Sequence, residues 1–174
     1  MVLLLQLDNI LMCYQLREET KYSGAKCRIY SVVKDGETIS LFDKFCNNYE
    51  KSHGDTVKFA KMLLLSIGKK YGLREQFVKD KEGAPGDGVC RFKSLPDKTI
   101  RLYFIQYGSI AIILGDGGIK PEGTRAWQDK EELITIVEEL KKVSKDVYAR
   151  QRSGDIKLDD LKGFIGNLDF TETE

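Results

Sequence analysis

Residues 88–121 read Gly88-Val-Cys-Arg-Phe-Lys-Ser-Leu-Pro-Asp-Lys-Thr-Ile-Arg-Leu-Tyr-Phe-Ile-Gln-Tyr-Gly-Ser-Ile-Ala-Ile-Ile-Leu-Gly-Asp-Gly-Gly-Ile-Lys-Pro121, and this stretch decides the fold. It holds three runs rich in β-branched and aromatic residues, which favour strands. Two turn signals, Pro96-Asp97 and Gly108-Ser109, separate the runs. The pattern therefore predicts a three-stranded antiparallel meander.

Basic side chains gather on one side of this expected meander, because successive side chains of a strand point to opposite faces. Guanidinium groups bind phosphate oxygens in a bidentate fork, and lysine adds a point charge, so the cluster suits a polyanion. The alternative is that these are ordinary solvent-facing residues, since antiparallel sheets commonly have one wet face. The residues concerned are Arg91, Lys93, Arg101 and Tyr103, with Lys120 and Arg125 close behind the third strand.

Composition fits one globular domain of modest charge. The chain has 174 residues with a net charge of only +1, whereas a dedicated nucleic-acid binder is usually far more basic. The charge is uneven, because residues 155–174 carry six acidic and two basic side chains, a net of −4, which leaves +5 for the rest. The body is therefore modestly basic and the C-terminal segment acidic.

The cysteines indicate a reducing compartment. Cys13, Cys27, Cys46 and Cys90 lack the close spacing of a zinc pair, and His53, the single histidine, has no partner in sequence. Such cysteines are typical of reduced, buried thiols, although one disulfide pair stays open as an alternative. No apolar run approaches the roughly 20 residues that a membrane-spanning helix needs, and the N-terminus lacks the basic start of a signal peptide. We expect a cytoplasmic protein that does not contact membranes.

Upstream of the meander, the pattern predicts an extension, a hairpin and two helices. Residues 1–25 are assigned to an N-terminal extension in which residues 1–14 suit a strand or a short helix. Asp35-Gly36 between two β-prone runs, residues 26–33 and 38–41, predicts a β-hairpin. Apolar residues then recur at helical spacing over residues 41–49 and 55–71. These two segments are expected to form an α-hairpin on the apolar face of the meander.

The remaining segments are two glycine stretches, a long helix and the C-terminal segment. Residues 83–88 and 115–118 match no phosphate-binding spacing and are expected to be flexible connections. A capping box of Asp129 and Glu132 starts a helix that runs to about residue 152. The acidic segment 153–174 contains recurring apolar residues, which favour docking on the core; the alternative is that it covers the basic face.

The order of elements and several phrases resemble one toxin family. Arg91-Phe-Lys-Ser-Leu-Pro-Asp-Lys-Thr-Ile-Arg-Leu-Tyr-Phe resembles the two strands of RelE/HigB-like toxins, of the phage-derived type in the ParE/RelE superfamily. Ile110-Ala-Ile-Ile-Leu with Gly118-Ile-Lys resembles the next strand and its trailing basic residue. The resemblance implies a RelE-like α+β domain over residues 26–152: an antiparallel sheet with an N-terminal α-hairpin and a C-terminal helix packed on it.

The same resemblance implies an endoribonuclease of a type II toxin–antitoxin system that cleaves messenger RNA without a metal or cofactor. In that chemistry the 2′-OH of the RNA attacks the adjacent phosphate. Arg101 would stabilise the phosphorane, Arg91 and Lys93 would grip phosphates, with one of them a candidate base, and Tyr103 would stack on a base. The implied catalytic residues are Arg101, Tyr103, Lys120 and Arg125, and the implied RNA-binding residues are Arg91, Lys93, Lys98 and Trp127.

The partners implied are RNA, including messenger RNA on the ribosome, and a cognate antitoxin protein. The chain departs from the family in its near-neutral net charge, its added N-terminal stretch and its acidic C-terminal segment. These departures favour an alternative, in which the chain is a non-catalytic protein of the same fold that binds RNA or a protein partner.

Overall fold

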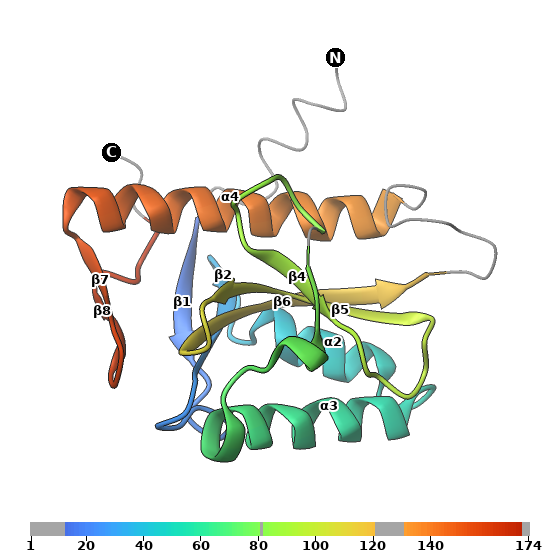
Figure 1. The fold of residues 1–174 in the computed structure, drawn as a ribbon. Helices are drawn as coiled ribbons and strands as arrows, with labels where there is room; N and C mark the ends of the chain where they lie inside the picture. Colours follow the sequence, from blue (N-terminus) through green and yellow to red (C-terminus); the bar gives the residue numbers. More distant parts are fainter. Residues whose placement is uncertain (1–12, 81, 121–130, 172–174) are drawn as a thin grey trace.

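The computed structural model describes residues 13–80, 82–120 and 131–171, and it shows one six-stranded sheet between two helical layers (Figure 1). In spatial order the strands are β1 (Tyr14–Glu18), β2 (Arg28–Lys34), β6 (Ala111–Ile119), β5 (Ile100–Tyr107), β4 (Val89–Phe92) and β3 (Val78–Lys79). The helices α2 (Leu41–Tyr49) and α3 (Gly54–Ser66) cover one face, and α4 (Glu131–Ser153) covers the other. The class is therefore α+β, as the sequence predicts.

The predicted meander is confirmed. β4 pairs with β5, and β5 pairs with β6, both antiparallel. Alternation along these strands divides the apolar side chains between two clusters, one under α4 and one under α2 and α3. The sheet is therefore buried on both faces over much of its area, which accounts for the long apolar runs in β5 and β6.

The expectation of a purely antiparallel sheet is wrong, because β2 runs parallel to β6. The β-hairpin expected at Asp35-Gly36 is also not formed: residues 37–40 are not a strand. Ser40 instead caps α2, and its side chain and that of Asp43 make a reciprocal capping box with the backbone. The helix start outcompetes the β propensity of this segment, and β2 finds its antiparallel partner upstream, in β1.

The glycine stretch at residues 115–118 is part of β6 and not a flexible connection. A Cβ at Gly115 would lie 2.8 Å from the Leu140 side chain, and one at Gly117 would lie 2.6 Å from the Phe45 ring. Glycines here let α4 and α2 approach the same strand from opposite faces. The pairing of β5 with β6 changes register between Leu102 and Phe104, which marks a β-bulge. The bulge lies at the glycine stretch, where the helices pack closely on the sheet.

The helical segments agree with the periodicity except at one end. α3 gives way to a π-helical turn, η1 (Ile67–Tyr71), and a short 3₁₀ turn, η2 (Glu75–Phe77), follows. A Cβ at Gly68 would lie 1.8 Å from the carbonyl oxygen of Tyr22, so the helix end and residues 22–24 touch through backbone alone. Among the described residues, no helix is long and apolar enough to cross a lipid bilayer.

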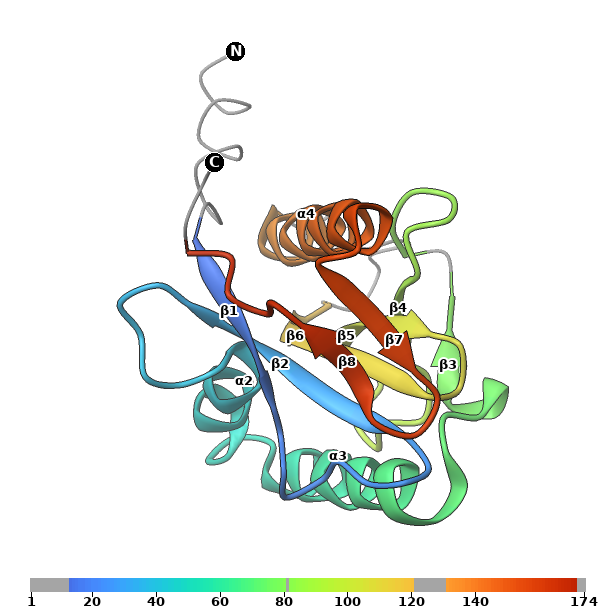
Figure 2. The same ribbon diagram turned by 90° about the vertical axis from the view of Figure 1, so that its left-hand side faces the viewer.

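Both terminal segments take part in the domain. β1 lies within the expected N-terminal extension and forms an edge of the sheet. The acidic C-terminal segment forms a second, two-stranded sheet of β7 (Ile156–Asp159) and β8 (Gly163–Gly166), which lies beside β1 and β2 and follows directly from α4 (Figure 2). Its last residues run along β1, where the Phe170 N–H donates to the Tyr14 carbonyl at 2.8 Å.

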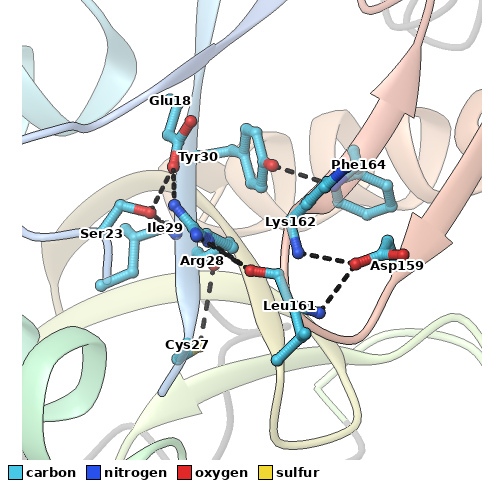
Figure 3. A network of polar contacts seen from close by, with 10 residues as sticks. All are labelled: Glu18, Ser23, Cys27, Arg28, Ile29, Tyr30, Asp159, Leu161, Lys162 and Phe164. Atoms are coloured by element: carbon cyan, nitrogen blue, oxygen red, sulfur yellow. Dashed lines mark hydrogen bonds and ion pairs between the residues drawn. The ribbon is translucent and has the colours of Figure 1, made fainter. Parts of the chain in front are cut away.

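A polar network holds this C-terminal hairpin against β2 (Figure 3). The Arg28 guanidinium donates to the Leu161 carbonyl at 2.9 Å and pairs with Glu18 at 3.3 Å. The Tyr30 hydroxyl oxygen accepts from the Phe164 N–H at 2.9 Å, while the two rings meet at 5.1 Å between centroids. The segment is therefore docked on the core through both backbone bonds and aromatic packing.

Candidate functional site

Arg91, Arg101 and Tyr103 lie on the α4 side of the sheet. Arg91 is directly opposite Tyr103 in the β4–β5 ladder, and Tyr103 belongs to the apolar cluster that α4 covers. Arg101 precedes Tyr103 by two residues on β5, so the two side chains leave the strand on the same side. The structure therefore brings these three residues together, and the electrostatic influence of both arginines on the Tyr103 hydroxyl reflects that proximity.

Arg91 is not a free cation. Its Nε donates to Glu82 Oε1 at 3.0 Å, and the two side chains are only 18% and 10% exposed. Glu82 precedes β4, and its backbone N–H donates to the Val89 carbonyl, which fixes it beside the strand. Nothing in the sequence marked Glu82 for this role, because the pair depends on how the segment before β4 folds back. The ion pair neutralises one of the two arginines at the candidate site.

Arg101 is half-buried and donates to the Lys98 carbonyl from Nη1. Burial, with a smaller contribution from the like charge of Arg91, lowers the pKa of the Arg101 guanidinium. An arginine still remains charged at any pH that the fold tolerates. The site therefore holds one partly desolvated guanidinium whose charge no described carboxylate pairs within salt-bridge distance, and partial desolvation strengthens its interaction with an anion.

Tyr103 is fully buried, and its hydroxyl has no hydrogen-bond partner within the described part of the chain. The ring has no open face, so the base-stacking role suggested for Tyr103 does not fit this arrangement. Burial, reinforced by the negative charge of Glu82, raises the pKa of the phenol, which stays a neutral donor. A buried hydroxyl without a hydrogen-bond partner lowers the stability of the fold.

Three lysines lie at the end of the sheet where β5 begins. Lys93 directly follows β4 and is exposed, and Lys98 is exposed in the β4–β5 turn. Lys120 follows β6, and its N–H donates to the Thr99 carbonyl at 2.7 Å, which places it beside the start of β5. The remaining two sequence candidates, Arg125 and Trp127, lie outside the described residues.

The turn that carries Lys98 is anchored by His53, for which the sequence offered no partner. His53 Nε2 lies 3.3 Å from Asp97 Oδ2, and the Asp97 N–H donates to the Thr56 hydroxyl. A hydrogen bond from the Thr99 side chain is the main cause that lowers the pKa of Asp97. These contacts tie the β4–β5 turn to the α2–α3 loop and restrict where Lys98 can reach.

The chain offers little for metal or thiol chemistry in its described part. No three His, Cys, Asp or Glu side chains there are arranged to hold a metal ion. Cys27, Cys46 and Cys90 are buried and Cys13 is half-buried, all four as free thiols. Burial raises the pKa of Cys90 to about 12 and that of Cys46 to about 11, so neither is a ready nucleophile.

Asp116 is a half-buried carboxyl that sequence reasoning did not single out, since it stands among glycines. Its Oδ1 accepts from the Gly117 N–H at 2.7 Å, and no lysine or arginine of the described residues pairs with it directly. Burial, with smaller effects from Glu139 and Glu132, raises the pKa of Asp116 to about 6. Nearby, Glu139 is occupied by Lys34 at 2.7 Å.

Replacing Asp116 with asparagine is expected to stabilise the fold above pH 6. The folded-state pKa of about 6 exceeds the ordinary 3.8, so the native state binds this proton more tightly and loses stability as pH rises from 4 to 6. Asparagine keeps the acceptor for Gly117 and has no charge to bury. Urea unfolding at pH 8 should show a gain of about 1–2 kcal/mol, allowing for solvent screening of a half-buried group. An equal increase in the free energy of unfolding at pH 4, where the carboxyl is protonated, would show that the charge of Asp116 is not the cause.

No family model, curated protein or solved structure matches the chain.

Proposed function

We propose that the chain is a RelE/HigB-like endoribonuclease that cleaves messenger RNA without a metal. The observation that carries the proposal is that Arg91 and Arg101 lie on one face of the sheet, and that no described carboxylate pairs with Arg101 within salt-bridge distance. The order of elements supports it too: two early strands, two helices, and then a meander whose last strand, β6, lies next to β2.

The proposed reaction is an in-line transesterification. A base takes the proton of the 2′-OH, O2′ bonds to the adjacent phosphorus, and the bond from phosphorus to O5′ breaks as O5′ takes up a proton. Arg101 stabilises the charge that develops on the phosphorane, whereas the fully buried Tyr103 phenol does not reach the RNA and takes no part in the step. We assign the exposed Lys93 to binding phosphate or acting as base, and Lys120, which lies beside the start of β5, to protonating or shielding the leaving oxygen. Preorganised donors of this kind are worth about 3 kcal/mol each.

Purified protein tests this proposal on programmed ribosomes and on free messenger RNA, in buffer containing EDTA at a level that keeps ribosomes intact. We expect cuts that leave a 2′,3′-cyclic phosphate, and slowed growth when the chain is expressed. A cognate antitoxin protein should suppress both effects. Intact messenger RNA in both settings, together with unaffected growth, would end the proposal.

A second candidate function is supported by the Glu82–Arg91 ion pair. A carboxylate at 3.0 Å from one guanidinium repels a phosphate and holds the arginine in place, as expected in a binding module that does not cleave. The near-neutral net charge of the chain points the same way. In this alternative the protein binds RNA or a protein partner on the same face.

Replacing Glu82 with glutamine should show whether this face binds RNA or a protein partner, because it changes the charge beside Arg91. The variant frees a guanidinium for phosphate, so RNA affinity at low salt should rise about fivefold and its logarithmic salt slope should steepen by up to about one unit. Glu37→Gln is the matched control, because Glu37 pairs with Lys44 elsewhere on the surface. Fluorescence anisotropy with a labelled RNA measures both. Unchanged RNA affinity would show that this face does not bind RNA and would favour a protein partner.

A further inference from the structure

A pocket of about 380 Å³ lies between the second half of α4 and the turn before β4. Its wall includes Gly86 and Gly88 from the turn, Tyr107 from the end of β5, and Lys141, Lys145 and Tyr148 from α4. The volume falls in the range of small-ligand sites. Because Tyr107 and Arg101 stand at opposite ends of β5, this pocket is separate from the candidate catalytic site.

The turn that forms one wall is fixed, although the sequence suggested a flexible connection. Gly86 and Gly88 have φ of +84° and +73°, which only glycine adopts without strain. The Asp87 carboxylate accepts from the Ala84 and Val89 N–H groups at 2.7 and 2.9 Å. Ser144 donates to the Asp87 carbonyl at 2.6 Å, which ties α4 to the turn. The carboxylate is thus engaged by the backbone and does not dominate the pocket.

The other walls combine aromatic rings with positive charge. Tyr148 is 60% exposed, with the Arg152 guanidinium 6.0 Å from its ring centroid, so much of its ring is open to stacking. Lys145 is exposed and has no ion-pair partner among the described residues, whereas Lys141 is held by Glu138 at 3.0 Å. The Tyr107 hydroxyl is buried with no hydrogen-bond partner in the described part, and its ring packs edge-on against Phe164 at 4.9 Å.

We propose that this pocket binds one unpaired base of single-stranded RNA together with its phosphate. Tyr148 stacks on the base, Lys145 contacts the phosphate, and the turn with Gly86 and Gly88 bounds the pocket on the other side. This inference rests on the proposed function for its ligand class and adds a second contact point, remote from Arg101. Aromatic stacking of this kind tolerates any base, because every base has a π-face. A free mononucleotide presents the same chemistry and is distinguished in the test.

The test uses the full chain, a labelled eight-nucleotide single-stranded RNA, and AMP, GMP, CMP and UMP as separate probes. Anisotropy should show RNA binding that Tyr148→Ala weakens about tenfold. Lys145→Gln removes the charge that faces the phosphate and should weaken binding a few-fold. Tyr71→Ala is the matched control, because Tyr71 is a 51% exposed tyrosine beside an arginine, beyond α3, and should bind RNA as the wild type does.

Amide chemical shifts measured by NMR show directly where the RNA binds. RNA should shift the amides of residues 86–88 and of the second half of α4. Equal RNA affinity of the wild type and the Tyr148→Ala and Lys145→Gln variants would overturn the inference. Mononucleotide binding in the pocket without any effect of the variants on RNA would assign it to free nucleotides and would also overturn it.

The two proposals fail separately. If messenger RNA stays intact on ribosomes while Tyr148→Ala still loses RNA affinity, the ribonuclease proposal falls and the base-binding pocket stands. If messenger RNA is cleaved and Tyr148→Ala binds RNA like the wild type, the pocket falls alone. Melting curves of each variant confirm that an exposed substitution has left the fold intact.

Discussion

Replacing Arg101 with alanine should lower messenger RNA cleavage by about two orders of magnitude and leave the fold intact. Removal of one preorganised donor to a developing oxyanion costs about 10²–10³-fold in rate in well-studied enzymes. Arg91 is paired with Glu82, whereas no described carboxylate lies within salt-bridge distance of Arg101. In this part of the chain the Arg101 guanidinium is therefore not engaged in an ion pair, and it can bind a phosphate. Single-turnover cleavage on programmed ribosomes, at saturating protein, measures the chemical step without the binding contribution.

Stability should change little in this variant. Arg101 is half-buried beside the like charge of Arg91, and burial lowers its pKa, so its charge is a cost to the folded state. Removing the charge therefore favours the folded state, and losing the hydrogen bond to the Lys98 carbonyl offsets part of that stabilisation. The melting temperature should therefore stay within a few degrees.

Two further variants sharpen the Arg101 experiment. Arg101→Lys keeps the charge and loses the planar fork, so cleavage should lie between the wild type and the alanine variant. Arg74→Ala is the control, since Arg74 is an exposed arginine over the Tyr71 ring, beyond α3. Full activity of Arg101→Ala would remove Arg101 from the mechanism, and equal losses in Arg101→Ala and Arg74→Ala would point to a general charge effect.

Ending the chain after Ser153 should destabilise the fold severely and should not act by uncovering the basic residues. The C-terminal segment buries Ile156, Phe164 and Phe170 against the core, and each such side chain contributes about 1.5–3 kcal/mol. The sum is a large part of the about 5–15 kcal/mol that stabilises a typical domain. The segment contacts β1, β2, α4 and Tyr107, and none of its polar or aromatic contacts within the described residues involves Arg91, Lys93 or Arg101.

A point variant keeps this prediction testable if the shortened chain does not fold. Phe164→Ala should cost about 3–5 kcal/mol, which lowers the melting temperature by about 10 °C or more. Leu161→Ala is the control in the same hairpin, because the Leu161 side chain is 72% exposed and only its carbonyl meets Arg28. A Phe164→Ala variant that melts with the wild type, or gains RNA affinity, would revive the idea that the segment is a removable cover.

The sequence alone determined the helices and strands that depend on residues close to one another in the chain. The meander follows from alternation within each run and from the residues of its two turns. The helices follow from apolar residues repeated every three or four positions. The candidates Arg91, Arg101 and Tyr103 share one face for the same reason, since strand alternation alone sets the side on which they lie. These signals act over a few residues, so the sequence displays them directly.

Tertiary structure decided which faces and strands meet, and that changed the character of the site. Only the parallel pairing of β2 with β6 sets the strand order, and only the approach of α2 and α4 explains the glycines at residues 115–118. The same long-range packing puts Glu82 on Arg91 and closes the ring of Tyr103 from solvent. Burial and ion pairing depend on groups far apart in the chain. Such groups come into contact only when the whole core packs, so no local sequence pattern predicts them.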